Sequence, residues 1–384
     1  MIIATIVGAR PQFIKASTVS RAIAMHNANL PAETAPIAHS PSPIHETIIH
    51  TGQHFDDNMS QFFFDELQIP KPDYHLGVSG GGHGAMTGAM LAKMEPMLQE
   101  IGPDWVLVYG DTNSTLAGAL AAAKLHIPVA HVEAGLRSFN RRMPEEINRI
   151  VSDQLSTILF CPTETAVKNL KAEGYPHKVS AHKKQQIANI GDVMFDAALF
   201  FGAKAEEKSQ IIHKLNLTPK DYVLATVHRA ENTDDPQRLT AIIDVLVKVS
   251  EKMPVILPLH PRTRKKLEAL DPEFLAHCSS LITLIDPLGY LDMVQLEKNA
   301  AVVATDSGGV QKEAYFHGIP CVTLREETEW VELVESGWNR LARPGRDDIQ
   351  DLVLTAVGSK GQDARPYGEG NAAELIIKRL LSNS

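Results

Sequence analysis

Two carboxylates come directly after two apolar runs in the middle of the chain. Residues 105–109 and 128–132 have strand length and composition, and Asp111 and Glu133 follow them. The segment between the runs starts with capping-type side chains and continues as an Ala/Leu-rich helix. A strand–helix–strand unit is parallel, so both carboxylates are expected at the sheet edge where open α/β sheets bind ligands. Two carboxylates at that edge indicate proton handling.

A third carboxylate, Glu145, is predicted in the first turn of the next helix. Pro144 fits the first helical position, which places Glu145 and Glu146 in that turn. The three carboxylates also have structural alternatives, which stay open at this point: Asp111 as a helix cap, Glu133 as the partner of Arg137, and Glu145 as the partner of Arg149.

Two cations follow the first strand of the chain. Residues 2–7 read as a strand, residues 8–11 as a turn, and a helix is expected to start near Gln12. Arg10 and Lys15 would then lie at a helix N-terminus, which is a plausible anion site. The alternative is a routine strand–helix turn with solvated charges.

Two histidines end strands in the second half of the chain. His228 follows the apolar run 222–227, and His260 follows the run 255–259. Histidine is well suited to contact phosphate and to titrate near neutrality. One such histidine could be a structural cap, but two at the same sheet edge favour a binding site.

A Ser-Gly-Gly turn gives the strongest phosphate signal. Ser307, Gly308 and Gly309 follow a strand at 301–304 and open a helix, so close backbone approach and free N–H groups favour an anion. Glu313 lies on that helix, where its carboxylate could accept hydrogen bonds from a ribose diol. A plain surface charge is the alternative for Glu313.

The composition restricts the class of protein. The chain has 384 residues, 44% apolar and 22% charged, which favours two soluble globular domains. A formal net charge of −9 argues against general nucleic-acid binding. Cys161, Cys278 and Cys321 show no metal or redox spacing and suit a reducing compartment. No run approaches membrane-spanning length and the start reads as a strand, so we expect a cytoplasmic protein with no membrane or nucleic-acid partner.

The order of the elements predicts an α/β protein with two Rossmann-like parallel-sheet domains. We expect residues 1–187 to carry the acid–base carboxylates and residues 188–367 to bind the diphosphate, with residues 368–384 as a terminal helix returning to the first domain. Domains with facing strand-end edges suit a nucleotide-sugar enzyme whose sugar lies in the cleft.

The ordered motifs of the chain resemble a known family. They cover nearly the whole chain and read GARPQFIK, TGQH, YGDTNSTLAGALAA, HVEAGLRS, MPEEINR, ATVHRAEN, PLHPRT, TDSGGVQKEA and LREETEW. Together they resemble the non-hydrolysing UDP-N-acetylglucosamine 2-epimerases, which have the glycosyltransferase-B fold.

The resemblance implies reversible inversion at C2 of a UDP-linked 2-acetamido sugar. A base removes the C2 proton while UDP leaves, and UDP re-adds after a proton returns to the opposite face. No metal, nicotinamide or other cofactor is involved. Asp111, Glu133 and Glu145 match the acid–base carboxylates, and His228 matches the residue that assists the leaving diphosphate.

The resemblance also implies how UDP is held, and implies a homodimer. The positions that match UDP contacts are Arg10, Lys15, Ser307, Gly308, Gly309 and Glu313, with Leu288 and Met293 at the uracil positions. In bacterial relatives a second UDP-sugar binds as an activator. Gln53, Arg229 and His260 match parts of that site, but Asp56 stands where a glutamine is usual.

One segment departs from the common family pattern. Thr328–Glu332 reads TEWVE where many members have TERPE, so an arginine expected near the phosphates is replaced by Trp330. This run and the run RSFNRRMPEE look more like the branch acting on UDP-2,3-diacetamido-2,3-dideoxyglucuronate, an O-antigen precursor. An anionic sugar would want a further cation, for which Arg137, Arg141 and Arg142 are candidates.

Two other classes stay open on the sequence alone. A UDP-sugar glycosyltransferase of the same fold would share the Ser-Gly-Gly helix but would not need three acid–base carboxylates. A nucleotide-sugar binding protein would bind UDP and turn nothing over.

Overall fold

The chain divides into two compact units. The computed structural model describes residues 1–30, 42–53, 71–178, 184–270 and 272–383. One unit combines Met1–Ala197 with Arg365–Ser384, and the other is Ala198–Ala364. Each unit holds one parallel sheet, so the predicted α/β class with two Rossmann-like domains is confirmed. The sequence also predicts a helix over residues 56–67, which lie outside the described residues.

The first unit is built on a parallel sheet of seven strands in the order β3-β2-β1-β4-β5-β6-β7. The order reverses direction at β1 and β4, which is where open sheets of this kind bind ligands at the carboxyl ends of the strands. The strands are β1 (Ile2–Val7), β2 (His45–His50), β3 (Tyr74–His75), β4 (Trp105–Tyr109), β5 (Val129–Val132), β6 (Ile158–Cys161) and β7 (Gln186–Asn189).

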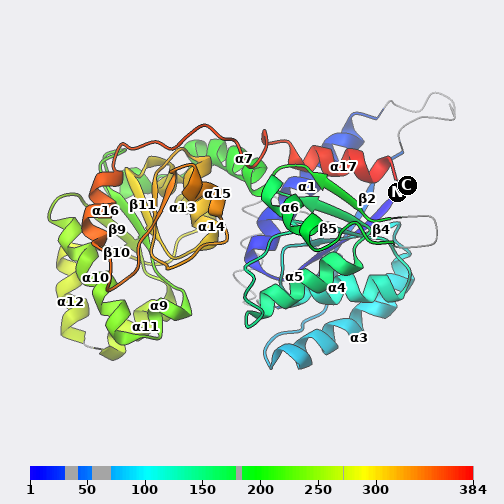
Figure 1. The fold of residues 1–384 in the computed structure, drawn as a ribbon, viewed down its shortest axis with the longest axis horizontal. Helices are drawn as coiled ribbons and strands as arrows, with labels where there is room; N and C mark the ends of the chain where they lie inside the picture. The colour runs from blue at the N-terminus through cyan, green and yellow to red at the C-terminus, as the bar shows by residue number, and fades with distance from the viewer. Residues whose placement is uncertain (31–41, 54–70, 179–183, 271, 384) are drawn as a thin grey trace. The chain divides into compact units, whose positions relative to one another are not determined.

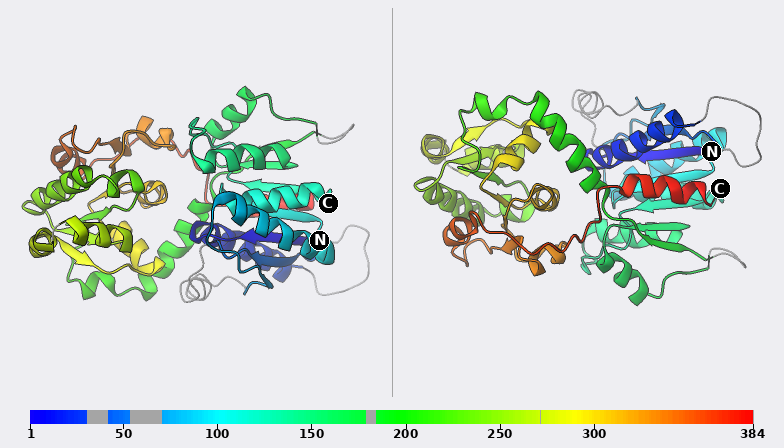
Figure 2. Two further views of the ribbon diagram at one scale, coloured as in Figure 1. Left: turned by 90° about the horizontal axis from the view of Figure 1, so that it is seen from below. Right: turned by 90° about the horizontal axis from the view of Figure 1, so that it is seen from above.

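Helices cover both faces of this sheet. Helices α3 and α4 pack on the face that carries Ile6, Val106 and Val108, while α1 and α17 lie side by side on the other face (Figures 1 and 2). The helices are α1 (Arg10–Ala28), α3 (His83–Ile101), α4 (Asn113–Lys124), α5 (Pro144–Leu155), α6 (Glu164–Ala172) and α17 (Ala372–Leu381), and α7 (Val193–Lys208) contains the boundary between the units.

The second unit repeats this architecture with a parallel sheet of six strands in the order β10-β9-β8-β11-β12-β13. Its core has one apolar cluster on each face of the sheet. The strands are β8 (Val223–Thr226), β9 (Val255–Pro258), β10 (Thr283–Ile285), β11 (Val302–Thr305), β12 (Cys321–Thr323) and β13 (Asn339–Leu341).

The helices of the second unit fall into two groups. Helices α10 and α16 contribute to the larger apolar cluster, together with β8, β9 and β11. Helices α13 and α14 contribute to the smaller cluster. The helices of this unit are α8 (Ile211–Lys214), α9 (Ala230–Thr233), α10 (Pro236–Ser250), α11 (Pro261–Leu270), α12 (Pro272–Leu281), α13 (Tyr290–Asn299), α14 (Gly308–Phe316), α15 (Val331–Glu335) and α16 (Ile349–Ala356).

Local sequence explains where several helices begin. Thr112 and Thr163 cap α4 and α6 through their hydroxyl groups, and Pro144 occupies the start of α5, as predicted. Helix α1 begins at Arg10, earlier than the expected Gln12, because the Gln12 side chain supplies the cap. The helical spacing of the methionines in α3 predicts that they are core residues, and Met90 and Met94 are indeed fully buried.

No helix among the described residues is both long enough and apolar enough to span a membrane.

Candidate active site

The turn after β4 brings polar side chains of the first unit together. Gly110 has a left-handed φ of 62°. A Cβ atom on this residue would lie 3.2 Å from Oε2 of Glu133 and 3.3 Å from Nζ of Lys15. Glycine therefore leaves room for a carboxylate and an ammonium group directly over the backbone beside Asp111.

Lys15 and Glu133 form an ion pair at this turn. Their side chains are only 10% and 9% exposed, so the pair is shielded from water. The backbone of Glu133 has a φ of 72°, which is uncommon for a residue with a side chain. Strained backbone of this kind persists where the surrounding structure holds it and is frequent at functional sites.

Asp111 has a cation of its own. Arg149 donates to the Asp111 carboxylate and also to Oε2 of Glu146 at 3.0 Å, while Nδ2 of Asn148 donates to the Asp111 carbonyl oxygen at 2.9 Å. Burial raises the pKa of Asp111, the Arg149 cation lowers it, the Glu133 carboxylate raises it and Lys15 lowers it. The net direction is upward, although the carboxyl side chain is still 33% exposed. An accessible carboxylate with a raised pKa can take up and release a proton.

Both structural alternatives for these carboxylates are wrong. The cap of α4 is Thr112, whose hydroxyl accepts from the Thr115 N–H, and not Asp111. Glu133 pairs with Lys15 and not with Arg137. The structure brings Asp111 and Glu133 to neighbouring strand ends, as predicted. It also places Lys15 of α1 beside Glu133, a pairing that was not predicted.

Arg137 has carboxylate partners inside the unit. Its guanidinium donates to Oδ2 of Asp153 at 2.7 Å and to both oxygens of Glu173 at 2.8 Å, and the residue is 6% exposed. Arg141 and Arg142 on the following loop are exposed.

Glu145 lies in the first turn of α5, as predicted, and is exposed. The pairing with Arg149 that its spacing allowed does not form, because Arg149 contacts Asp111 and Glu146 instead. Glu146 is buried and accepts hydrogen bonds from the backbone N–H groups of Ser138 and Phe139, which fixes the loop before α5.

The turn after β1 holds Arg10 at the first residue of α1. The N–H groups of Gly8 and Ala9 donate to Oε1 of Gln12 at 2.9 and 3.1 Å. Nε2 of Gln12 in turn donates to the carbonyl oxygen of Tyr109 at 2.8 Å. Gln12 therefore joins this turn to the turn that carries Asp111.

In the second unit, Asp306 organises the turn that carries His228. The fully buried carboxylate of Asp306 accepts from the N–H groups of His228 at 3.1 Å and Arg229 at 3.0 Å, and from Nδ2 of Asn232 at 3.0 Å. The His228 side chain remains 39% exposed. Its ring lies 5.5 Å from the ring of His260, which confirms that the two strand-end histidines meet at one edge.

The Ser-Gly-Gly turn begins α14 as expected. Ser307 is the N-cap, and Gly308 and Gly309 form the first turn. A Cβ on Gly308 would lie 2.5 Å from Oε1 of Glu329. Glu329 accepts from Nη1 of Arg325 at 2.9 Å, and the Arg325 and Arg229 cations outweigh burial and lower its pKa. A carboxylate held beside two guanidinium groups lies next to this helix start.

Glu313 is not a surface charge, so that alternative is wrong. The residue is 7% exposed and accepts from the Tyr290 hydroxyl at 3.1 Å. Leu288 and Met293 pack against the same apolar cluster as Val310 of α14. The carboxylate and the two apolar side chains therefore come from elements that pack together.

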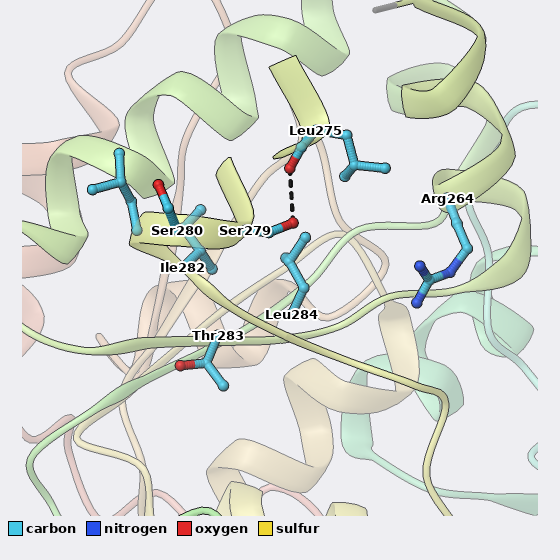
Figure 3. A pocket seen from close by; sticks show the side chains of 8 residues that line it. Arg264, Leu275, Ser279, Ser280, Ile282, Thr283 and Leu284 are labelled. Carbon is cyan, nitrogen blue, oxygen red and sulfur yellow. Dashed lines mark hydrogen bonds between the residues drawn. The ribbon is translucent and has the colours of Figure 1, made fainter. Parts of the chain in front are cut away.

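A separate pocket lies in the second unit (Figure 3). It has a volume of about 420 Å³ and is lined by residues of α11, α12 and β10, none of which was predicted to belong to the site. Its one charged lining residue, Arg264, donates to Asp286 at 2.9 Å. No group of His, Cys, Asp and Glu that could hold a metal ion occurs among the described residues.

Several polar side chains of these sites escaped the sequence-based reasoning. Gln12, Asn148 and Asp306 act by accepting from or donating to the backbone of distant turns. Glu329 acts as the carboxylate partner of the Arg325 and Arg229 guanidinium groups. The available signal was their position, since Asp306 directly follows a strand and Gln12 lies in the first turn of a helix.

Two parallel-sheet units with polar turns at the strand ends define an α/β enzyme of the glycosyltransferase-B fold class. A family model described as UDP-N-acetylglucosamine 2-epimerase matches residues 38–381. The chain therefore belongs to the UDP-N-acetylglucosamine 2-epimerase family, a family of isomerases.

Individual relatives cover the whole chain. A UDP-2,3-diacetamido-2,3-dideoxy-D-glucuronate 2-epimerase of Pseudomonas aeruginosa is 52% identical over 99% of both chains. The structure of Methanocaldococcus jannaschii UDP-GlcNAc 2-epimerase in complex with UDP-GlcNAc and UDP is 40% identical, with a TM-score of 0.84 and full coverage of both chains. The Neisseria meningitidis enzyme bound to UDP-GlcNAc is 29% identical, with a TM-score of 0.83 and full coverage of both chains.

Proposed function

We propose that the protein interconverts UDP-GlcNAc-type and UDP-ManNAc-type sugars by inverting the configuration at C2. The observation that carries this proposal is the pair of carboxylates, Asp111 and Glu133, at adjacent strand ends, each beside a shielded cation. The family membership and the UDP-GlcNAc bound by two structural relatives support the same reaction.

The chemistry demands this kind of site. A base takes the C2 proton, and the electron pair of the broken C2–H bond forms a C1–C2 double bond. At the same time the C1–oxygen bond breaks and UDP leaves with the electron pair of that bond. Return of a proton to the opposite face of C2 and re-addition of UDP at C1 give the epimer. The C2 proton is not acidic, so the step needs a positioned base and cations that stabilise the departing diphosphate.

The first unit supplies the proton-transfer groups in this proposal. Asp111, Glu133 and Glu145 serve as the acid–base carboxylates. The raised pKa of Asp111 and its accessible carboxylate support a role in moving the proton. Arg10 and Lys15 provide positive charge for the diphosphate, and Lys15 also balances Glu133.

The second unit holds UDP in this proposal. The start of α14, at Ser307, Gly308 and Gly309, offers N–H groups to the diphosphate. His228, which assists the leaving group, has its backbone fixed by Asp306. Glu313 accepts from the ribose, and the remaining contacts come from Arg229, His260, Leu288 and Met293.

A second candidate concerns the sugar and not the reaction. The 52% identical relative is named for UDP-2,3-diacetamido-2,3-dideoxy-D-glucuronate, which carries an additional carboxylate on the sugar. Arg137 has Asp153 and Glu173 as partners, so exposed Arg141 and Arg142 are the better supported cations for that group.

Proton exchange at C2 tests both points. The protein is incubated in D2O with UDP-GlcNAc and, separately, with UDP-2,3-diacetamido-2,3-dideoxyglucuronate, and NMR follows deuterium incorporation at C2. We expect deuterated, manno-configured product, and the faster substrate identifies the sugar. If the anionic sugar is preferred, Ala substitution of both Arg141 and Arg142 should raise its KM selectively.

Asp111→Asn should reduce exchange by about 100-fold or more if the carboxylate moves the proton. Glu95→Gln, on the exposed side of α3, is the matched control and should exchange normally. Absence of exchange with both sugars would contradict the epimerase proposal. Sugar transfer to an acceptor without exchange at C2 would instead establish the glycosyltransferase class.

We also propose a cytoplasmic homodimer that supplies surface-polysaccharide or O-antigen precursors. The dimer is the expectation for the family, and the three cysteines, which are free and buried, suit a reducing compartment. Sedimentation analysis of the purified protein tests the dimer, and loss of O-antigen on deletion in the source organism tests the cellular role.

A further inference from the structure

A histidine that is not among the proposed acid–base groups lies beneath the carboxylates. His131 is on β5, two residues before Glu133, and is 0% exposed. In the sheet it is paired with Val108 of β4 and Leu159 of β6, so it lies in the middle of the first unit. A polar side chain in such a position must have all its hydrogen-bonding groups satisfied.

Both ring nitrogens of His131 face acceptors. Nε2 lies 2.7 Å from the carbonyl oxygen of Gly110, and Nδ1 lies 2.7 Å from Oδ1 of Asp153. A carbonyl oxygen can only accept, so Nε2 must carry a hydrogen. A neutral ring would then leave Nδ1 without a hydrogen, directly opposite a carboxylate oxygen.

The surroundings of Asp153 decide where the remaining proton lies. Its other oxygen, Oδ2, accepts from Nη1 of Arg137 at 2.7 Å and from the N–H of Gly135 at 3.1 Å. Two donors, one of them a guanidinium, favour the ionised carboxylate. The proton between Asp153 and His131 therefore belongs to the ring.

We propose that His131 is a buried imidazolium that positions the proton-transfer site. This positioning role rests on the proposed function and adds His131 to the groups named there. Its two N–H groups hold the Gly110 carbonyl and the Asp153 carboxylate. The Gly110 carbonyl belongs to the peptide whose N–H is that of Asp111, so fixing one end of this planar unit fixes the other.

The same link reaches the turn after β5. Asp153 accepts from the Gly135 N–H, and Gly135 is two residues beyond Glu133. Glu133, whose backbone is strained with a φ of 72°, lies along the chain between His131 and Gly135, and Asp153 contacts both of these residues. The pair therefore connects the turn of Asp111 with the turn of Glu133.

Charges around the ring balance the buried cation. Asp153 of α5 faces Nδ1, and Arg137 and Glu173 form the next ion pair outward. Cys161 of β6 stays a neutral thiol, because burial first and then Asp153 raise its pKa. Beyond the Gly110 carbonyl lie the remaining charged groups of the site: Lys15, Glu133, Asp111 and Arg149.

NMR of the unmodified protein tests the protonation state without using activity. Protein labelled with ¹⁵N-histidine is recorded under the conditions of the activity assay, and the His131 signals are assigned from their loss in His131→Gln. We expect both ring nitrogens to carry hydrogen, because each faces an acceptor. A ring with one unprotonated nitrogen would overturn the proposal. If His131→Gln does not fold, the His131 signals can be assigned in the unmodified protein through their coupling to neighbouring nuclei.

Kinetics test the positioning role. His131→Gln should lower kcat by about 10- to 100-fold and leave KM within a few-fold, since the carboxylates are displaced and UDP contacts are not. Val129→Ala is the matched control, because Val129 is buried on the same face of the same strand and packs in the apolar cluster with α3 and α4. It should lose stability but keep its kcat.

The outcomes separate this inference from the proposed function. Unchanged kcat in folded His131→Gln, or equal losses of kcat in His131→Gln and Val129→Ala, would overturn the positioning role. If the unmodified protein shows no C2 exchange, the epimerase proposal and the positioning role that depends on it both fail. The NMR result still decides the charge of His131.

Discussion

Asp111 and Glu133 each have a cation within contact. The cation beside Asp111 influences how readily that carboxylate takes up a proton. Arg149 lowers the pKa of Asp111, while burial and the charge of Glu133 raise it. As a result of these opposing effects, the pKa of Asp111 stays above its usual range and the carboxyl group can exchange a proton. A change at the cation should therefore be visible in the pH dependence of the reaction.

Arg149→Met should move the acid limb of the pH profile of kcat/KM to higher pH. The sign follows because removal of the positive charge raises the pKa of Asp111 further, so a higher pH is needed to ionise it. Arg149→Lys keeps the charge and should show a smaller shift. An acid limb that stays in place, or moves to lower pH, would show that Asp111 is not the group whose ionisation limits the reaction.

Asp306→Asn should weaken UDP binding and destabilise the second unit by about 1–3 kcal/mol, because an amide nitrogen would face N–H donors that the carboxylate now satisfies. Titration calorimetry with UDP and thermal unfolding measure the two effects. Asp244→Asn, an exposed change on α10 of the same unit, is the control. Equal behaviour of the two variants would contradict the role of Asp306.

The strand-end position of Asp111 and Glu133 could be predicted from the sequence, but their partners could not. Lys15 and Glu133 are 118 residues apart, and Arg149 is 38 residues from Asp111. Periodicity and spacing report only neighbours along one element, and for Arg149 they favoured Glu145. The choice among several nearby charges depends on the three-dimensional path of the turns.

Helix starts were more accessible to prediction than strand bounds. Thr112, Thr163 and Pro144 act through local hydrogen bonds and backbone angles, so their signals lie within one turn of the chain. The apolar pattern of the sequence predicts a strand over residues 47–50, but strand β2 begins at His45, because its first residues pair with Ile2 and Ile3 of β1. Such pairing is decided by the neighbouring strand.

At the scale of elements, Asp196 joins α7 to α17. Its carboxylate accepts from the N–H groups of Ala372 at 3.1 Å and Ala373 at 2.8 Å, at the start of α17. Burial raises the pKa of Asp196 to about 6 from its usual value of 3.8. The backbone N–H groups lower it, but not enough to offset the burial.

This raised pKa predicts a pH-dependent stability. The folded state holds the proton more tightly, so the contribution of Asp196 is fully present below about pH 3.8 and is lost as pH rises through about 6, on the order of 3 kcal/mol in total. About 1 kcal/mol of this loss falls between pH 5 and pH 7. Asp196→Asn should remove it, and urea unfolding of both proteins at the two pH values measures the difference. Parallel pH dependences would contradict the assignment.

At the scale of the whole molecule, the first unit contains both ends of the chain, since Arg365–Ser384 groups with Met1–Ala197. Ile376, Ile377 and Leu380 of α17 are buried, and α17 packs on α1. Twenty residues at the end of the sequence thus contribute to a core whose other residues precede the second unit.

Ile376→Ala should destabilise the first unit by about 2–5 kcal/mol and leave the second unit unchanged. Hydrogen exchange followed by mass spectrometry can separate the two, with β1 and α1 expected to lose protection and β8 and β11 to keep it. Lys378→Ala, on the exposed side of the same helix, is the control. Equal loss of protection in both units would show that they do not unfold separately.

The first unit is built from two segments that are separated in the sequence, and this has a consequence during protein synthesis. The second unit is one continuous segment, so it can fold as soon as Ala364 has left the ribosome. The first unit must wait, with the apolar surface of α1 uncovered, until α17 emerges. The part made first is thus completed last, and in that interval the nascent chain is most exposed to chaperones and to aggregation.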